Sequence, residues 1–107
     1  MIIKSKKNRQ KMFKKLGQYF SEARKSAGVS QLEVSSELGF SSPQHISNIE
    51  RGLASPNFDI IRKLIKIYVL SEARVIEDMA NIQKEFLRSE IRGVEYKDKP
   101  SRNRLSS

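Results

Sequence analysis

Apolar residues recur at helical spacing between residues 12 and 91, and glycines, prolines and capping residues divide the pattern into segments. A first predicted helix begins between Asn8 and Phe13 and ends at Gly28, because glycine readily adopts the left-handed conformation of a helix C-terminus. Its apolar positions lie three or four residues apart and form one stripe. That stripe consists of Met12, Leu16, Phe20, Ala23 and Ala27.

The next segment has the signature of a capped short helix. Ser30 is followed three residues later by Glu33, a spacing that allows each side chain to bond the backbone amide of the other. Val34 and Leu38 then form the inner face, and Gly39 ends the helix after about two turns.

A second short helix is predicted to start at Ser42 and Pro43. Serine satisfies free amides at a helix start, and proline is tolerated at the first helical position. Ile46 and Ile49 supply the buried side, and Gly52 ends the helix.

Two further helices complete the chain. A fourth is predicted to begin near Asn57 or Phe58 and to carry an apolar stripe of Phe58, Ile61, Leu64, Ile65 and Tyr68. Ser71 caps a fifth helix that ends before Gly93 and extends roughly 30 Å, at about 1.5 Å per residue.

The fifth helix carries an apolar seam that has two interpretations. Its members are spaced four, three and four residues apart, as in a short coiled coil, and are Val75, Met79, Ile82 and Phe86. The stripe is widened by Ile76, Ala80, Leu87 and Ile91. It is predicted to form a dimer interface. The alternatives are that it packs back on the first and fourth helices, or that it binds another protein.

Charge is concentrated at the ends of the chain. The formal net charge is +9, with nine basic residues and one acidic residue in residues 1–29, and four basic and one acidic in 97–107. Residues 30–57 hold one basic and three acidic residues. Such ends suit a polyanion, because Lys and Arg that neutralise phosphates release counterions. A solvated tail is the alternative interpretation, and a membrane surface is less favoured because no strongly amphipathic basic face is present.

Composition excludes several other classes. The chain has no cysteine and one histidine, which excludes a disulfide framework, a Cys/His zinc site and thiol catalysis. No serine, histidine and acid are arranged for catalysis, and there is no glycine-rich phosphate loop, so neither an enzyme nor a cofactor site is expected. No apolar run approaches the ~20 residues of a membrane span, and no secretory signal is present, so a cytoplasmic protein without a membrane partner is predicted.

The helix from about Ser42 to Arg51 presents short polar side chains on its outward side. With Ile46 and Ile49 inside, the outward positions hold Gln44, His45, Ser47 and Asn48. Gln and Asn amides can bond adenine N6 and N7, and each such pair discriminates between bases by ~1–3 kcal/mol. The alternative is that these amides only solvate the helix.

The segment SQLEVSSELGFSSPQHISNIERG, residues 30–52, resembles the helix-turn-helix of the Cro and phage-repressor family, also called the XRE family. The resemblance continues through LASPNFDIIRKLIKIY and back to LGQYFSEARKSAG, covering residues 16–68. It implies an all-α, five-helix, lambda-repressor-like DNA-binding domain with an extended C-terminal helix and basic flexible termini. The implied organisation is a basic arm in 1–11, the domain in 12–70, a C-terminal helix in 71–93 and a flexible tail in 94–107.

The resemblance also implies roles for single residues. Gln44 and Asn48 fall at base-reading positions, with Pro43 and Ser47 beside the bases. Phosphate contacts are implied for Gln31, His45 and Asn57. Arg24 and Glu50 match a partly buried ion pair of several relatives.

Three departures from the family pattern affect these roles. The turn is one residue longer, through Ser41 and Ser42; residues 30–57 are net acidic; and Pro43 stands where many relatives have a base-reading side chain. Phosphate affinity is therefore expected from the N-terminal arm. Its candidates are Lys4, Lys6, Lys7, Arg9, Lys11, Lys14 and Lys15.

The predicted function is that of a small bacterial transcriptional regulator, a homodimer that reads double-stranded DNA with the helix from Ser42 to Arg51 in the major groove. One alternative is an antitoxin that wraps a toxin with its C-terminal helix and autoregulates its operon. Another is a protein-interaction module that has lost DNA binding, which the acidic motif region would favour.

Overall fold

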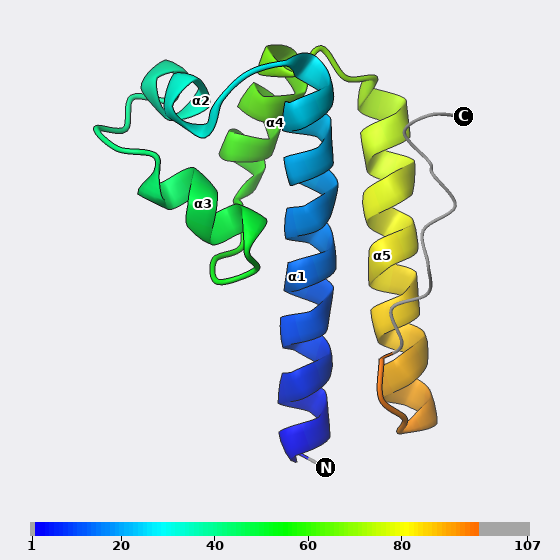
Figure 1. The fold of residues 1–107 in the computed structure, drawn as a ribbon. Helices are drawn as coiled ribbons and strands as arrows, with labels where there is room; N and C mark the ends of the chain where they lie inside the picture. The colour runs from blue at the N-terminus through cyan, green and yellow to red at the C-terminus, as the bar shows by residue number, and fades with distance from the viewer. Residues whose placement is uncertain (1, 97–107) are drawn as a thin grey trace.

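The computed structural model describes residues 2–96 of the chain, with side chains from residue 6 onward. Within that range there are five helices and no strand, which confirms the all-α class. They are α1 (Ile2–Ala27), α2 (Gln31–Glu37), α3 (Gln44–Glu50), α4 (Phe58–Ile67) and α5 (Glu72–Arg92). The long helices α1 and α5 lie side by side, and α2 and α3 are on the opposite side of α1 from α5 (Figure 1).

The first helix begins much earlier than the sequence pattern predicted. It starts at Ile2 rather than between Asn8 and Phe13, so the predicted basic arm is a helical extension of the domain. Residues 2–11 contain no glycine or proline that would break the helix. The extension is held from outside by a contact that local sequence does not reveal. The side chain of Lys4, one of the predicted phosphate contacts, lies outside the described residues.

The N-terminal extension of α1 is anchored by Asn8, which is almost fully buried. Its Oδ1 accepts a hydrogen bond from the backbone N–H of Tyr96 at 2.6 Å. Its Nδ2 donates to Glu90 Oε2 at 2.8 Å and to the carbonyl of Val94 at 3.0 Å. The prediction of a flexible tail is therefore wrong for residues 94–96, because they pack against α1 and Tyr96 is buried. Residues 97–107 lie outside the described part of the chain.

One hydrophobic core joins all five helices. Its most deeply buried side chains come from α1, α2, α3, α4 and α5, and include Phe20, Val34, Ile46, Ile49, Leu64 and Val75. The prediction that Phe58 belongs to the inner stripe of α4 is wrong, because its side chain is 75% exposed. Helix α4 starts at Phe58 in a register that turns Ile60, Ile61 and Leu64 inward instead.

The predicted dimer seam of α5 packs within the chain. Val75 and Ile82 are 1% and 3% exposed in the hydrophobic core, Met79 packs against that core, and Phe86 is half-buried. Val75 and Ile82 are therefore core residues of the chain and are not available to the predicted dimer interface, and of the two core partners proposed for the seam, α1 is the one in extensive contact with α5. The physical reason is the length of α1, which runs beside most of α5 (Figure 1).

Candidate nucleic-acid interface

The first helix of the motif, α2, is held at its start by the predicted capping box. Ser30 Oγ accepts from the backbone N–H of Glu33 at 3.0 Å, and Glu33 Oε1 accepts from the backbone N–H of Ser30 at 2.8 Å. Because these bonds favour the ionised carboxylate, they lower the pKa of Glu33 below its usual value. This cap fixes where the chain leaves the α1–α2 loop and enters α2.

The turn between the two motif helices is fixed by backbone geometry and by an aromatic contact. Gly39 has φ = 85°, a conformation that glycine adopts at little cost. The backbone N–H of Phe40 then donates to the carbonyl of Ser35 at 2.8 Å. The rings of Phe40 and His45 lie 4.5 Å apart between centroids, which ties the turn to the first turn of α3.

Helix α3 begins one position later than the Ser-Pro pair predicted. The helix runs from Gln44, Pro43 is the residue that precedes it, and Pro43 makes no side-chain cap. Ser42 Oγ accepts from the backbone N–H of Gln44 at 3.4 Å, a long bond. The predicted span of about 42–51 and the observed helix describe the same element, because Pro43 and Arg51 flank α3 directly at its two ends.

The amides of α3 form a connected group on its outer side. Ile46 and Ile49 are buried, whereas Gln44 is exposed. Gln44 Nε2 donates to Asn48 Oδ1 at 2.9 Å. Arg51 Nη2 donates to the same oxygen, also at 2.9 Å. Arg51 was not among the contacts predicted from the sequence, although its spacing of three residues from Asn48 places the two side chains on one helix face.

Helix α3 is held very close to α1 by glycines on both sides of the contact. A Cβ atom at Gly17 would lie 2.3 Å from the carbonyl oxygen of Ile49 and 2.7 Å from that of Glu50. A Cβ atom at Gly52 would lie 2.6 Å from Cα of Lys14. All three distances are far below van der Waals contact, so a residue with a side chain cannot occupy either position without a backbone shift. These contacts set the distance between the backbones of α1 and α3.

The predicted ion pair between Arg24 and Glu50 is present and lies between α1 and α3. Arg24 Nε donates to Glu50 Oε2 at 2.7 Å, and Nη2 donates to Oε1 at 3.2 Å. The guanidinium also donates to the carbonyl of Val29 at 2.9 Å. The bond to Glu50 raises the pKa of Arg24, while burial opposes the shift. Gln31 Nε2 donates to Glu50 Oε1 at 2.9 Å, so the carboxylate joins α1, α2 and α3.

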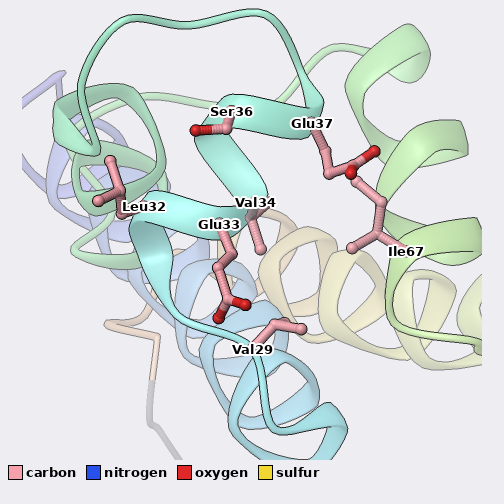
Figure 2. Close-up of a pocket in the computed structure, with 7 residues that line it drawn as sticks. All are labelled: Val29, Leu32, Glu33, Val34, Ser36, Glu37 and Ile67. Atoms are coloured by element: carbon pink, nitrogen blue, oxygen red, sulfur yellow. The ribbon is translucent and has the colours of Figure 1, made fainter.

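The net acidic charge of residues 30–57 does not fall on the outer side of α3. Glu50 is neutralised by Arg24, which lies outside that segment. The other two acids, Glu33 and Glu37, line a groove between α2, the α1–α2 loop and the end of α4, together with Val29 and Ile67 (Figure 2). No residue of α3 lines this groove. The acidity of the motif is therefore compatible with a polyanion bound at α3.

The remaining predicted contacts are distributed over several elements. Asn57 caps α4, with its Oδ1 accepting from the backbone N–H of Ile60 at 2.9 Å. Pro43 is exposed, and Ser47 and His45 are half-buried. On α1, the exposed basic side chains among the predicted contacts are Lys6, Lys7, Arg9 and Lys14.

The basic residues of α1 do not all face the same way. Lys6 and Arg9 share a helix face with Phe13 and with Gly17, the point of contact with α3. Lys7 and Lys11 lie on a different face, and Lys11 donates to the carboxylate of Glu95 and to the carbonyl of Tyr96. Lys6 and Arg9 therefore lie on the same side of α1 as the motif, as does the exposed Lys14, whose backbone meets Gly52 just after α3.

Among the described residues, no group of three or more His, Asp or Glu is placed to hold a metal ion. None of the helices between residues 2 and 96 is long and apolar enough to span a membrane.

Two short helices joined by a tight turn, with an exposed polar face on the second, define a helix-turn-helix DNA-binding domain. The model of the helix-turn-helix family matches residues 20–73, which include all of α2, α3 and α4. The chain is also similar to the cryptic phage CTXphi transcriptional repressor RstR of Vibrio cholerae. The two are 30% identical over 77 residues, which are 72% of this chain and 68% of the repressor.

The chain therefore belongs to the helix-turn-helix family and is a DNA-binding transcriptional regulator. No solved structure gave a significant match to it.

Proposed function

We propose that this protein binds a specific duplex DNA sequence with α3 in the major groove and acts there as a transcriptional repressor. The observation that carries the proposal is the hydrogen-bonded group of Gln44, Asn48 and Arg51 on the outer side of α3. The similarity to a phage transcriptional repressor supports the sign of regulation.

The bond between Gln44 and Asn48 prepares both amides for base recognition. It uses the Gln44 nitrogen and the Asn48 oxygen. The amide oxygen of Gln44 and the amide nitrogen of Asn48 take no part in that bond, and they supply an acceptor and a donor to a base edge. Adenine presents the complementary pair, N6 as donor and N7 as acceptor. Arg51 adds positive charge beside the amides, where phosphates would flank the groove.

Phosphate contacts hold such a domain in register on the duplex without reading sequence. Lys6 and Arg9 are the best placed residues of α1 for this role. They lie on the face of α1 that contacts α3, in the part of the helix that precedes this contact. Gln31, His45 and Asn57 are the proposed contacts within the domain. Gln31 is held by Glu50 at the start of α2, and Asn57 is held by its cap at the start of α4.

A homodimer is part of the proposal, because a single small module reads too few bases for high specificity. Two copies on a two-fold site would read half-sites about 34 Å apart, or a multiple of that distance.

The test is selection of bound sequences from a random duplex pool, followed by binding of the recovered sequence to variants. Gln44→Ala with Asn48→Ala is expected to weaken binding to the selected sequence by ~1–3 kcal/mol, the value of the one bidentate pair that the two amides make together with an adenine edge. Binding to unrelated duplex should persist. The matched control is Asn81→Ala with Gln83→Ala, which removes two exposed amides from α5.

A pool that yields no enriched sequence would contradict specific recognition. Equal loss of binding to selected and unrelated duplex would contradict the base-reading role of the two amides.

A further inference from the structure

The side-chain oxygen of Asn48 accepts two hydrogen bonds on the outer side of α3. Gln44 Nε2 donates to it at 2.9 Å from four residues earlier, and Arg51 Nη2 donates to it at 2.9 Å from three residues later. An amide oxygen has two lone pairs, so both of its acceptor directions are used within the protein. The Nδ2 group of Asn48 and the Oε1 atom of Gln44 take part in neither bond. These two groups are therefore the ones that the pair presents to a ligand.

Arg51 determines which way round the two amides lie. A guanidinium group carries five N–H donors and no acceptor, so only the oxygen of the Asn48 amide can bond to it. Once that oxygen faces Arg51, the amide of Gln44 can bond to it only through nitrogen. Without Arg51, the two amides could also pair in the reverse order, with the oxygen of Gln44 accepting from the nitrogen of Asn48. The donor–acceptor order of the pair thus depends on a third residue.

The backbone around Arg51 is held in place next to Asn48. The N–H of Arg51 donates to the carbonyl of Ser47 at 3.0 Å. The following Gly52 packs against the backbone of α1. The N–H of Leu53 then donates to the carbonyl of Asn48 at 2.8 Å, which turns the chain back toward the residue that Arg51 binds. The exposed guanidinium therefore extends from a segment whose position relative to the amides is fixed.

The order of the amides decides which base edge they fit. In the order that Arg51 imposes, Gln44 offers an acceptor and Asn48 offers a donor, which match the N6 donor and the N7 acceptor of adenine. In the reverse order, Gln44 would place a donor against N6 and Asn48 an acceptor against N7, so both contacts with adenine would be mismatched. Thymine, whose O4 atom is an acceptor, would instead suit the nitrogen of Gln44. A fixed order therefore favours adenine.

We propose that Arg51 is a positioning residue that makes the protein specific for adenine at one position, by fixing the donor–acceptor order of Gln44 and Asn48. The inference rests on the proposed function, because it concerns the two amides that are proposed to read DNA. It goes beyond that proposal, in which Arg51 contributes only positive charge.

The first test uses the full chain without DNA. The ¹⁵N–¹H heteronuclear NOE measures how strongly each side-chain NH₂ group is immobilised. The NH₂ group of Gln44 is expected to be restricted in the native protein, and Arg51→Met should increase its mobility. The exposed amide of Gln83 on α5 is the internal control and should not change. Unchanged circular dichroism shows that the variant keeps its fold.

The second test measures affinity for the sequence selected from the random duplex pool and for its three variants at one adenine. That adenine is the position at which Gln44→Ala with Asn48→Ala removes the base preference. The native protein should prefer adenine there by about 5- to 150-fold, which corresponds to the ~1–3 kcal/mol of one bidentate pair at about 1.4 kcal/mol per tenfold. Arg51→Met should lower this preference, because both amide orders become accessible.

Arg51→Glu tests the direction of the effect. An ionised carboxylate has only acceptors, so at residue 51 it would attract the NH₂ group of Asn48 and impose the reverse order. The preference for adenine should then be lost, and thymine should bind at least as tightly. Lys14→Met is the control for the loss of positive charge. Lys14 is exposed on the same side of α1 as the motif and takes no part in the hydrogen-bonded group, so its loss should weaken binding to all four sequences alike.

Three results would overturn the proposal. The first is a Gln44 amide whose mobility is the same in the native protein and in Arg51→Met. The second is an unchanged adenine preference in Arg51→Met and Arg51→Glu, with a salt slope less negative by about 0.9 in Arg51→Met, as expected for a phosphate contact. The third is a loss of preference at a neighbouring guanine instead, which would make Arg51 itself a base-reading residue.

Failure of the proposed function gives a different result. A selected sequence without any adenine that depends on Gln44 and Asn48 would contradict base reading by the two amides, and with it their specificity for adenine. The heteronuclear NOE would still show whether Arg51 orders the amides in the free protein.

Discussion

Glu50, at the last position of α3, accepts a hydrogen bond from Arg24 in the last turn of α1, with Nε and Oε2 2.7 Å apart. The side chain of Arg24 is 11% exposed and that of Glu50 is 7% exposed, so both charges are largely removed from water. This pair fixes the recognition helix to α1, and Gln31 extends the connection to α2. The helix that presents the amides is thereby held by charge as well as by apolar packing.

Loss of one partner of this pair should destabilise the fold strongly. Glu50→Gln and Arg24→Leu each leave an uncompensated buried charge or remove its hydrogen bonds, with an expected loss of ~3–5 kcal/mol in the free energy of unfolding. The measurement is urea denaturation. Arg62→Leu is the control, since Arg62 pairs with Asp59 at the exposed surface and should cost ~1 kcal/mol or less. A loss at Glu50 or Arg24 no larger than the loss at Arg62 would argue against a structural ion pair.

A methyl group at residue 17 should force α1 and α3 apart. Gly17→Ala improves helix propensity by about 1 kcal/mol, but it places Cβ against two backbone carbonyls that cannot rotate away. We expect a net destabilisation of ~1–3 kcal/mol by thermal denaturation. Gln18→Ala, at an exposed neighbouring position, isolates the effect of helix propensity and should change stability by ~0.5 kcal/mol or less. A Gly17→Ala protein more stable than the native one would show that the close approach is not required.

The salt dependence of DNA binding should report the role of the α1 extension. Each phosphate contact contributes about −0.9 to the slope of log affinity against log salt concentration, and four contacts would give about −3.6. Lys6→Gln with Arg9→Gln should therefore make the slope less negative by about 1.8. Lys7→Gln with Lys25→Gln removes the same charge from another face of α1 and should change the slope less. Equal changes in the two double variants would indicate a diffuse charge effect instead of defined contacts.

The capping box of α2 should contribute stability only above acidic pH. The pKa of Glu33 is lowered in the folded state, so its ionised cap contributes fully above its unfolded pKa, near 4.5, and the contribution is lost as the pH falls through the lower folded value. Glu33→Gln keeps the capping geometry without this titration. The Tm difference between native protein and Glu33→Gln should therefore be present at pH 7 and shrink below about pH 4. A difference that is constant from pH 7 to pH 3 would exclude this linkage.

Local signals in the sequence determined most of the helix boundaries. The capping box at Ser30, the glycine at residue 39 and the serine cap at Ser71 are all present as predicted, because such signals depend on residues within one turn of each other. The inward positions of Ile46 and Ile49, and the outward position of Gln44, followed from helical periodicity alone. The family resemblance placed Arg24 and Glu50 correctly as an ion pair.

Tertiary contacts decided the rest, because they join residues far apart in the chain. The helical extension to Ile2 is anchored by Asn8 on residues 90–96, and no local pattern in 1–11 encodes that contact. Helix α5 carries two adjacent apolar stripes, and periodicity could not say which one faces inward. The length of α1 settled the choice, since it covers Val75 and Ile82 and leaves Ile76, Leu87 and Ile91 in solvent.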